Sequence, residues 1–592
     1  MKHPERLFDC IEYLLEKNPS LDLLAGKKEG GWKKYTVAET ARIVNELSAG
    51  LLALGISAND GTPLGRDKIS IISKNRPEWL MVDLAVQQIG AVLTPIYPTI
   101  NLQELEFILG DAEVKVVFVN DVSLFHKVAG IKNRLPQLQH IFSFDYISGV
   151  SHWEEILDNN RDLMDEVKSI SAGIVTEDLA TIIYTSGTTG IPKGVMLSHR
   201  NIVSNVMASV PCLPSVDSMR ALSFLPLNHI LERMVSYLYL FAGTTIFYAE
   251  SLETVGENLR EVKPHFFTTV PYLLEKVYEK IMSTGNSLTG IKRKLFMWAH
   301  GLATRFEINR KLPLGYTIQL ALANKIVFSK WREGLGNEVK AIVSGGAACQ
   351  VRLIRIFTAA RIIIMEGYGL SETSPVISVN RYDEKGRMFG TVGPLIDGVQ
   401  VKIANDGEIL CKGPNIMMGY YKHPELTAEV MEEGWFKTGD IGMMVDGDFL
   451  KITDRKKEMF KTSGGKYVSP LPIEGKLKES LLVENAIVIG AEQKYTGALI
   501  VPAFSNLVEW CKSNDIEYTS DSEMIKNKNV IALYKEIVEN SNKGFNPVEQ
   551  IKKFELLPHN WSVETGELTP KLSLKRKVIL ERHRDAVVRI YN

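Results

Sequence analysis

The sequence predicts an α/β protein with a large N-terminal domain of βαβ sheets, a small β-rich lobe and a small α+β domain at the C-terminus. Three observations predict this class. Short apolar runs alternate with helical patterns in the first third of the chain, short strands follow one another closely after about residue 400, and a charged segment precedes a compact tail. With 592 residues, of which 45% are hydrophobic, the chain can bury a large core.

The βαβ pattern begins with the strand-like run KISIIS at residues 68–73. The helical pattern RPEWLMVDLAVQQIGA, the run VLTPIY, the helical pattern NLQELEFILGDAEV and the run VKVVFVN follow in that order. Strands that alternate with helices predict a parallel sheet covered by helices. The run LATIIYT at residues 179–185 precedes a Gly/Thr loop and an apolar-periodic stretch from Ser198, which predicts another βα unit.

The second half of the chain has a different pattern. The short strands VQVKIA, GEILCKG and DFLKIT predict the β-rich lobe. The charged segment DRKKEMFKTSGGK then leads to the strands ENAIVIGA and GALIVPA and to a basic terminal helix. We therefore predict two domains, residues 1–454 and 455–592, with the boundary in the charged segment.

Composition excludes several classes of function. Lysine plus arginine (69) nearly equals aspartate plus glutamate (70), so the chain has no overall field that would attract nucleic acid or an anionic membrane. Five scattered cysteines, without a CxxC pair, predict no zinc site and a reducing compartment. The N-terminus resembles no signal peptide and no run of about 18 apolar residues occurs, which predicts a cytoplasmic protein. A peripheral contact with the inner membrane face stays an alternative, because residues 292–332 mix lysine and arginine with aromatic and leucine residues at helical spacing.

The most informative segment is YTSGTTGIPKG at residues 184–194. Glycines let the backbone approach an anion closely, and hydroxyl groups, backbone N–H groups and the ammonium of Lys193 can surround it. The segment is not a Walker A loop, which needs GxxxxGK[ST]. It therefore predicts a phosphate-binding loop of another kind.

YTSGTTGIPKG resembles the phosphate-loop signature of the adenylate-forming (AMP-binding) superfamily. The resemblance continues through MEGYGLSET (365–373), WFKTGD (435–440) and DRKKEMFKTSGGKYVSP (454–470). Within that superfamily, LPLNHILER, VPYLLEKVY and GPNIMMGYYK resemble the long-chain fatty acyl-CoA synthetase branch. The resemblance implies the adenylate-forming enzyme fold with a mobile C-terminal domain, and it implies a long-chain fatty acid:CoA ligase.

The implied substrates are a fatty acid, ATP and coenzyme A, with Mg²⁺ as the metal. The carboxylate would attack the α-phosphorus of ATP to give acyl-AMP and pyrophosphate, and the thiol of coenzyme A would then displace AMP. Cations and preorganised donors lower the barrier of such a step because charge accumulates on phosphate oxygens. Two alternatives remain: an acyl-AMP ligase that delivers to a carrier protein, and a non-catalytic homologue that binds nucleotide or lipid.

The resemblance assigns the triphosphate and its metal to two motifs. The residues expected at the β- and γ-phosphates are Thr185, Ser186, Gly187, Thr188, Thr189, Gly190 and Lys193. Glu372, with Thr185, is expected to hold Mg²⁺, an ion that proteins bind through one or two carboxylates beside phosphates. Lys193 and Glu372 are also the expected catalytic residues.

Further motifs are expected to hold the nucleoside. Tyr368, beside Gly369, offers a ring that could stack on adenine, with core packing as the alternative. Asp440 has two acceptor oxygens for the ribose hydroxyls, and Arg455 would add a ribose or phosphate contact. Gly345 and Gly346 resemble the wall of the adenine pocket.

Further expectations concern His229, the hinge and the thiolation face, and these rest on the resemblance. His229 is expected near the acyl and nucleotide pockets as a catalytic residue, with a satisfied core histidine as the alternative, while Glu232 and Arg233 are interpreted as a structural ion pair. Lys457 occupies the hinge position between the domains. The residues expected at the thiolation face and pantetheine tunnel are Lys461, Gly464 and Gly465.

The chain departs from the family pattern near its C-terminus. Where the family has a string such as LTPTLKLKR, this chain has LTPKLSLKR at residues 568–576, so Ser573 stands at the position of the expected catalytic lysine. Lys571 lies two residues earlier and shares a face with Ser573 on an extended segment. We predict that Lys571 replaces the missing lysine; the alternative is that adenylation is slower or proceeds without this group.

Overall fold

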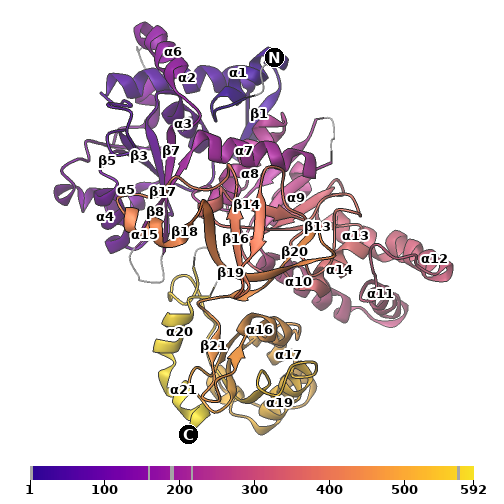
Figure 1. The fold of residues 1–592 in the computed structure, drawn as a ribbon. Coiled ribbons are helices and arrows are strands. Elements are labelled where there is room, and N and C mark those ends of the chain that lie inside the picture. Colours follow the sequence, from indigo (N-terminus) through magenta and orange to yellow (C-terminus); the bar gives the residue numbers. More distant parts are fainter. Residues whose placement is uncertain (1–3, 158–160, 187–191, 215–217, 570–573) are drawn as a thin grey trace.

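The structure is a computed structural model that describes residues 4–157, 161–186, 192–214, 218–569 and 574–592. Two large sheets with their helices form the upper body in Figure 1, a β-rich lobe lies beneath them, and the C-terminal domain hangs below the lobe. The two chain ends lie at opposite ends of the molecule. The α/β class with a smaller C-terminal domain is therefore confirmed.

The first sheet has seven strands in the order β17–β8–β7–β4–β3–β5–β6. Its strands are β3 (Lys68–Ile72), β4 (Val92–Ile96), β5 (Val114–Val119), β6 (His140–Ser143), β7 (Leu179–Ser186), β8 (Pro192–Ser198) and β17 (Gly419–Tyr420). Every residue of β3 and β4 is buried, as parallel strands with helices on both faces require. The helices between these strands are α3 (Pro77–Gln88), α4 (Leu102–Asp111) and α5 (Val122–Ala129), so the predicted βαβ units are confirmed.

Strand β8 corrects the prediction of a simple βα unit after residue 179. It runs antiparallel to β7, so the Gly/Thr segment connects the two strands of a hairpin and does not lead directly into a helix. Helix α7 (His199–Ser209) begins after β8, where the Ser198 side chain accepts a hydrogen bond from the Asn201 N–H in a capping box. The sequence pattern does not predict β8, because its seven residues include a proline and a glycine, which are typical of a loop.

The second sheet has eight strands in the order β14–β13–β12–β11–β9–β10–β1–β2. Its strands are β1 (Asp22–Lys28), β2 (Gly31–Thr36), β9 (Arg220–Ser223), β10 (Thr245–Tyr248), β11 (Phe266–Thr269), β12 (Ala341–Ser344), β13 (Ile363–Gly369) and β14 (Val376–Val379). The helices of the upper body not yet named are α1 (Asp9–Lys17), α2 (Val37–Ala53), α6 (Met164–Gly173), α8 (Ile230–Phe241), α9 (Val255–Val262), α10 (Pro271–Ser287) and α14 (Val351–Ala359). The 3₁₀ helices are η1 (Lys132–Arg134), η2 (Trp153–Leu157), η3 (Arg161–Leu163), η4 (Val210–Cys212) and η6 (Ser371–Thr373).

A second group of helices extends outward from the second sheet. It comprises α11 (Gly290–Ala303), α12 (Leu314–Ala323), the π-helical segment η5 (Asn324–Phe328) and α13 (Ser329–Gly334). Helices α11 and α12 project furthest, at the right of Figure 1. We call residues Gly290–Gly334 the projecting arm.

The core between the two sheets contains a buried ion pair that differs from the predicted one. Arg233 of α8 pairs with Asp83 of α3 at 2.6 Å between Nη2 and Oδ1, and both side chains are fully buried. The Tyr237 hydroxyl donates to Asp83 Oδ2 at 2.8 Å, and Arg233 Nη1 donates to Thr181 Oγ1 of β7 at 2.7 Å. The predicted Glu232–Arg233 pair is therefore wrong, because adjacent residues on a helix point in different directions.

The β-rich lobe is confirmed as a five-stranded antiparallel sheet. Its strands are β15 (Gln400–Ile403), β16 (Glu408–Lys412), β18 (Met431–Glu432), β19 (Trp435–Val445) and β20 (Phe449–Arg455), with α15 (Pro424–Val430) before β18. Strand β20 then leads directly into the C-terminal domain (Figure 1).

The C-terminal domain has its own hydrophobic clusters. Its strands are β21 (Phe460–Lys461), β22 (Tyr467–Val468), β23 (Val483–Ile489), β24 (Thr496–Pro502) and β25 (Ile551–Leu556). Its helices are α16 (Pro470–Leu477), α17 (Phe504–Ser513), α18 (Asp521–Met524), α19 (Lys528–Ser541), α20 (Arg576–Arg582) and α21 (Arg584–Tyr591). The last buried residue in the hydrophobic clusters of the preceding chain is Leu450, and the first in those of this domain is Val468. A domain boundary at residue 454 stays a prediction.

Candidate active site

Lys193 lies at the loop end of the β7–β8 hairpin. Cross-strand pairing sets it opposite Thr185, and Ser186 pairs with Pro192 at the last described positions before the loop. The Lys193 ammonium lies 5.4 Å from the centroid of the Tyr420 ring, within the range of a cation–π contact. The predicted loop residues Gly187, Thr188, Thr189 and Gly190 lie outside the described residues. Lys193 is thus held beside the ends of the strands that flank this loop.

Tyr420 connects Lys193 with Glu372. Strand β17 pairs with β8, which sets Tyr420 opposite Val195. The Tyr420 hydroxyl donates a hydrogen bond of 2.9 Å to Glu372 Oε1, and the Met417 N–H donates to the Glu372 carbonyl at 2.9 Å. Burial, followed by the charge of Glu372, raises the pKa of Tyr420, so the phenol stays protonated and remains a donor. The segment GPNIMMGYYK resembles the long-chain branch of the family, but its pattern predicts no role for the two tyrosines.

The residues present fit a magnesium ion that is shared with phosphate oxygens. Glu372 is half-buried, and within the described part of the chain its side chain makes one hydrogen bond, through Oε1. Thr185, which pairs with Lys193 across the hairpin, offers a hydroxyl as a neutral oxygen. No cluster of three or more His, Cys, Asp or Glu residues that could hold a metal occurs among the described residues. One carboxylate and one hydroxyl suit Mg²⁺, which keeps waters and phosphate oxygens as its other ligands.

Asp440 forms the centre of a second cluster. The Tyr368 hydroxyl donates to Asp440 Oδ2 at 2.7 Å, and Arg455 Nε lies 3.2 Å from Oδ1. The Asp440 side chain is 4% exposed, and burial raises its pKa while Arg455 and Tyr368 offset part of that rise. Each carboxylate oxygen has two lone pairs, so each can still accept one hydroxyl of a ribose. Tyr368 is thus a hydrogen-bond donor as well as a candidate stacking ring.

A short segment joins the two clusters. Tyr368 lies near the end of β13, and Glu372 follows in η6. A Cβ at Gly369 would lie 1.7 Å from the carbonyl oxygen of Pro375, so only glycine fits where the chain doubles back. The close approach of the backbone at Gly369 keeps the Asp440 and Glu372 clusters in one fixed arrangement.

The predicted adenine wall lies against the start of α8. A Cβ at Gly345 would lie 3.0 Å from Leu231 Cδ2, and Gly346 has a φ of +80° and is exposed. His229 caps this helix, because its Nδ1 accepts a hydrogen bond of 3.2 Å from the Leu231 N–H. The structure therefore brings the segment of Gly345 next to the segment of His229. Their roles toward a ligand stay predictions.

The predicted hinge and thiolation residues follow β20. Lys457 is exposed in the turn between β20 and β21. The Lys461 ammonium lies 4.7 Å from the Tyr467 ring centroid across the β21–β22 pair. Gly464 and Gly465 form the turn of that pair, and Gly465 has a φ of +74°. Lys571 and Ser573 lie outside the described residues, so the prediction for the catalytic lysine stays a prediction.

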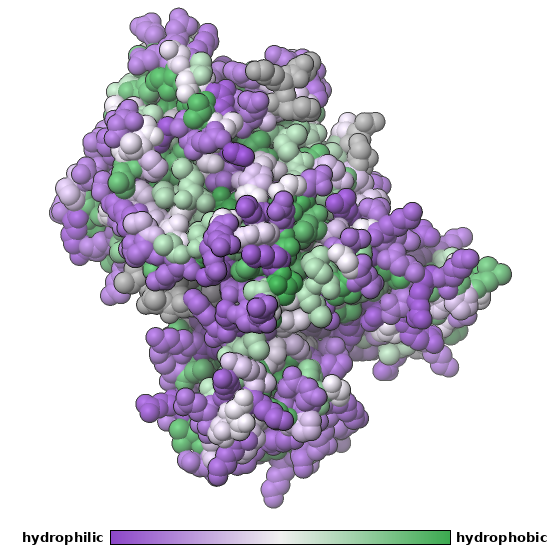
Figure 2. Space-filling view, viewed as in Figure 1, coloured by the Kyte–Doolittle hydropathy of each residue, from purple (hydrophilic) through white to green (hydrophobic). Residues whose placement is uncertain are grey.

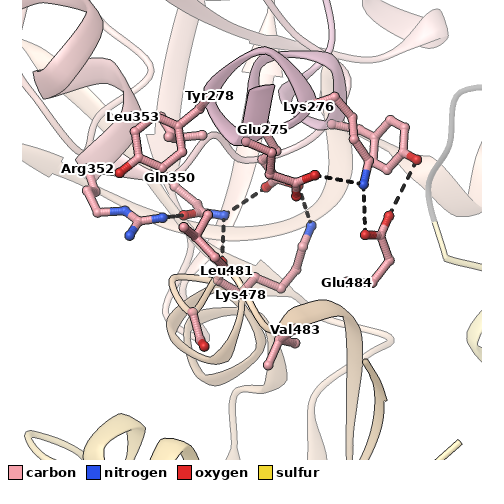
Figure 3. Close-up of a pocket in the computed structure, with 13 residues that line it drawn as sticks. Glu275, Lys276, Tyr278, Gln350, Arg352, Leu353, Lys478, Leu481, Val483 and Glu484 are labelled. Atoms are coloured by element: carbon pink, nitrogen blue, oxygen red, sulfur yellow. Dashed lines mark hydrogen bonds and ion pairs between the residues drawn. The ribbon is translucent and has the colours of Figure 1, made fainter. Parts of the chain in front are cut away.

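The two domains also meet at a crevice that the sequence analysis did not predict (Figure 3). Lys276 of α10 pairs with Glu484 at 2.7 Å, and Lys478 pairs with Glu275 of α10 at 2.9 Å. Gln350 donates to Glu275 at 2.9 Å. The Glu484 side chain is 11% exposed, so this ion pair is partly shielded from solvent. Charge complementarity across a domain interface has no signature in a single sequence.

Comparison with known proteins identifies the class. The sequence model of the AMP-binding enzyme family matches residues 15–421, and that of the AMP-binding enzyme C-terminal domain matches residues 458–592. The chain belongs to the AMP-binding enzyme family. This confirms the predicted resemblance to the adenylate-forming superfamily.

Individual relatives indicate which branch of the family the chain resembles. The chain is 33% identical to the long-chain-fatty-acid–CoA ligase FadD15 of Mycobacterium bovis, across 95% of this chain and 93% of that protein. It is 32% identical to the human long-chain-fatty-acid–CoA ligase 1, across 88% of this chain and 78% of that protein. These relatives confirm the resemblance to the long-chain fatty acyl-CoA synthetase branch.

Solved structures agree in fold. The adenylation domain of a carboxylate reductase from Mycobacterium chelonae superposes with a TM-score of 0.76 at 21% identity, covering 99% of this chain and 91% of that chain. A fatty acyl CoA synthetase from Mycobacterium tuberculosis superposes with a TM-score of 0.62 at 20% identity, covering 98% and 99%.

Proposed function

We propose that the protein is an ATP-dependent long-chain fatty acid:CoA ligase. The observation that carries this proposal is the arrangement of Lys193, Tyr420 and Glu372 beside the β7–β8 hairpin, next to the cluster of Tyr368, Asp440 and Arg455. The first group offers a cation and a metal-binding carboxylate to a triphosphate, and the second offers a buried carboxylate to a ribose. The relatives in the long-chain-fatty-acid–CoA ligase group support the choice of acid and acceptor.

The proposed reaction has two steps. A carboxylate oxygen of the fatty acid bonds to the α-phosphorus of ATP while the bond to the β-phosphate oxygen breaks, which releases pyrophosphate. The thiol of coenzyme A then loses its proton and bonds to the acyl carbon, and AMP leaves. Lys193 would neutralise phosphate charge and Asp440 would fix the ribose, so the reacting atoms are aligned.

Magnesium completes the proposed site. Glu372 and Thr185 would hold it, and the ion would neutralise charge on the phosphates of ATP. The Tyr420 hydroxyl orients the Glu372 carboxylate through one oxygen, which leaves the other oxygen for the metal. Arg455 uses Nε for Asp440, so its remaining N–H groups can meet a phosphate or a ribose oxygen.

The experiment that tests the function is pyrophosphate release from ATP across fatty acids of increasing length, with and without coenzyme A. We expect turnover to rise with chain length and acyl-CoA to form from free coenzyme A. Lys193→Ala should lose this activity, while Lys330→Ala, on the projecting arm, should keep it. Acyl-AMP that accumulates without acyl-CoA would instead indicate a carrier-protein acceptor, and no pyrophosphate release with any acid would indicate a non-catalytic homologue.

We further propose that Lys571 supplies the cation that the family pattern places at Ser573. Lys571→Ala should lower acyl-AMP formation by about a hundredfold, in the range of a lost transition-state contact, while Ser573→Ala should retain it. The measurement is single-turnover acyl-AMP formation without coenzyme A. Full first-step activity in Lys571→Ala, combined with its loss in Ser573→Ala, would refute the assignment.

A lipid substrate also bears on where the protein acts. No helix in the described part of the chain is long and apolar enough to cross a membrane. Long-chain acids partition into bilayers, so we propose that the protein acts in the cytoplasm and meets its substrate by a peripheral contact with the membrane face. The enzyme's other substrates are water-soluble small molecules.

A further inference from the structure

Helix α12 is apolar on two opposite sides, although it lies at the periphery. Its inner side packs Tyr316, Leu320 and Ala323 against the core cluster of the second sheet. Its outer side carries Leu314, Ile318 and Leu322, which are 78%, 62% and 48% exposed. These three residues recur at every fourth position and form one stripe, which Ile326 of η5 continues at 45% exposure. A helix that is apolar all round is normally buried on all sides.

The space-filling view shows where this stripe lies. The outer end of the projecting arm in Figure 2 is green, and it is surrounded by purple, hydrophilic residues. The arm stands away from the rest of the body in Figure 1. The stripe is therefore accessible to a flat surface, because no other part of the molecule reaches beyond it on that side.

The arm is strongly basic, in contrast to the neutral chain. Residues 290–334 contain nine lysines and arginines and two acidic residues, Glu307 and Glu333, whereas the whole chain has a net charge of −1. Glu307 pairs with Arg355 outside the arm, and Glu333 pairs with Lys330 within it. The exposed bases of the arm that make no ion pair within the described residues are Lys292, Arg293, Lys294, Arg305, Arg310, Lys311 and Lys325.

These bases flank the stripe. Arg310 and Lys311 lie a few residues before α12, and Lys325 lies next to Ile326 just beyond the other end of the helix. Two hydrogen bonds, from Tyr316 to the Leu302 carbonyl at 2.8 Å and from Trp298 to Gln319 at 3.4 Å, align α11 antiparallel to α12. The start of α11, with Ile291 and Lys292–Lys294, therefore lies beside the end of the stripe. Ile291 is itself 77% exposed.

We propose that the projecting arm docks on an anionic lipid bilayer, with the stripe Leu314, Ile318, Leu322 and Ile326 inserted into the headgroup region. Aliphatic side chains at the bilayer interface flanked by lysine and arginine are the features of interfacial helices. A protein partner would need a matching acidic and apolar surface, whereas an anionic leaflet offers both features over its whole area. The biological use of this surface, delivery of a membrane-dissolved acid, rests on the proposed function, but the binding itself does not.

Vesicle co-sedimentation of the full-length protein, without ATP or coenzyme A, tests the proposal. The vesicles contain phosphatidylcholine alone or phosphatidylcholine mixed with phosphatidylglycerol. We expect binding to the mixed vesicles that weakens as salt is added, and weaker binding to phosphatidylcholine alone. The triple variant L314S/I318S/L322S should lower the binding at least about tenfold, since each serine removes an inserted aliphatic side chain.

The matched control is L64S/L252S/I531S, which removes three exposed aliphatic side chains outside the arm and should bind vesicles as the unmodified protein does. Substituting Arg310, Lys311 and Lys325 by Gln should lower binding to the mixed vesicles alone and reduce its salt dependence. Unchanged vesicle binding in L314S/I318S/L322S overturns the proposal. So does a dimer of the unmodified protein that this variant converts to a monomer without loss of vesicle binding.

The two proposals fail separately. Acyl-CoA formation from a short, water-soluble acid without vesicles should be equal in L314S/I318S/L322S and in the unmodified protein. If the unmodified protein forms no acyl-CoA in this assay, the proposed ligase function is refuted, while the result on vesicle binding is unaffected.

Discussion

Tyr420 is the residue through which a lysine and a carboxylate of distant segments meet. Its ring faces the Lys193 ammonium and its hydroxyl donates to Glu372. Tyr420→Phe keeps the ring and removes the donor, so Glu372 loses its orientation. A hydrogen bond to a carboxylate contributes about 1.5–3 kcal/mol, so we expect pyrophosphate release to fall about tenfold or more and to need more Mg²⁺.

Tyr421 provides the control for this prediction. Its buried hydroxyl has no hydrogen-bond partner among the described residues. Tyr421→Phe should therefore leave pyrophosphate release unchanged. If both variants behave alike, the hydroxyl of Tyr420 has no role of its own in orienting Glu372.

Glu232 makes the stability of the upper body depend on pH. Burial raises the pKa of this carboxyl from 4.5 to about 8, although the nearby Ser223 and Thr268 hydroxyls lower it in part. The folded state holds the proton more tightly than the unfolded state, so stability is highest below pH 4.5 and falls as pH rises through about 8. The neutral variant Glu232→Gln should avoid this loss and raise stability near pH 9 by about 1–4 kcal/mol.

The measurement is the unfolding midpoint as a function of pH. The midpoints of Glu232→Gln and of the unmodified protein should be closest in acid and separate as the pH rises. The exposed Glu429→Gln should follow the unmodified protein throughout. A constant difference between Glu232→Gln and the unmodified protein at every pH would contradict the assignment of a buried, protonated carboxyl.

For individual residues, the sequence predicted which residues belong to the site better than it predicted their hydrogen-bond and ion-pair partners. The resemblance nominated Lys193, Glu372, Tyr368, Asp440 and Arg455, and the structure brings them into two linked clusters. It did not predict that Tyr368 donates to Asp440 or that Asp83 is the partner of Arg233. Those contacts join segments far apart in the chain, and periodicity carries no information about such pairs.

Among the elements, the turn after β13 is the most tightly constrained by its packing. A side chain at Gly369 would overlap the Pro375 carbonyl, so Gly369→Ala forces the segment that carries Tyr368 and Glu372 to move. Overpacked sites typically lose about 1–3 kcal/mol of stability, so we expect this variant, with a backbone overlap, to lose about 3 kcal/mol and to lose ATP-dependent activity. Thermal unfolding and pyrophosphate release are the measurements.

Helix α16 offers a matched glycine. Gly475 lies within that helix, and a methyl group added there would meet no atom within 4 Å beyond the backbone of its own helix. Gly475→Ala should therefore be tolerated and should stabilise the helix by up to about 1 kcal/mol. Equal behaviour of the two glycine variants would show that the backbone at Gly369 has room to relax.

Strands were predictable from sequence where they were long and apolar. The runs at β3, β4, β5, β7, β23 and β24 were all recognised, because buried strands have few polar residues. Strand β8 was not, because PKGVMLS begins with the residues of a loop. Its partner β17 has only two residues, which no periodicity can reveal.

The whole molecule depends on how its domains contact each other. Glu484→Lys removes the pair with Lys276 and sets two like charges together at a partly buried site. We expect the C-terminal domain to detach more often, so that trypsin cuts faster in the exposed link of Arg455, Lys456 and Lys457. The readout is the rate of cleavage at this link, followed by gel electrophoresis.

Charge reversal distinguishes this contact from a general loss of stability. The double variant K276E/E484K should restore the slow cleavage, whereas Lys330→Glu, in a surface pair of the projecting arm, should not change it. Fast cleavage that persists in the double variant would mean that Glu484 acts through another contact.

Both large sheets are completed by strands from remote parts of the chain. In the first sheet, strand β17, at residues 419–420, pairs with β8 at one edge, whereas the other strands lie between residues 68 and 198. In the second sheet, β1 and β2, at residues 22–36, form one edge, whereas the other strands lie between residues 220 and 379. During synthesis the first sheet keeps the β8 edge unpaired until the ribosome has passed residue 420. An unpaired strand edge is a template for aggregation, so a nascent chain of this protein is most in need of chaperone protection over that interval.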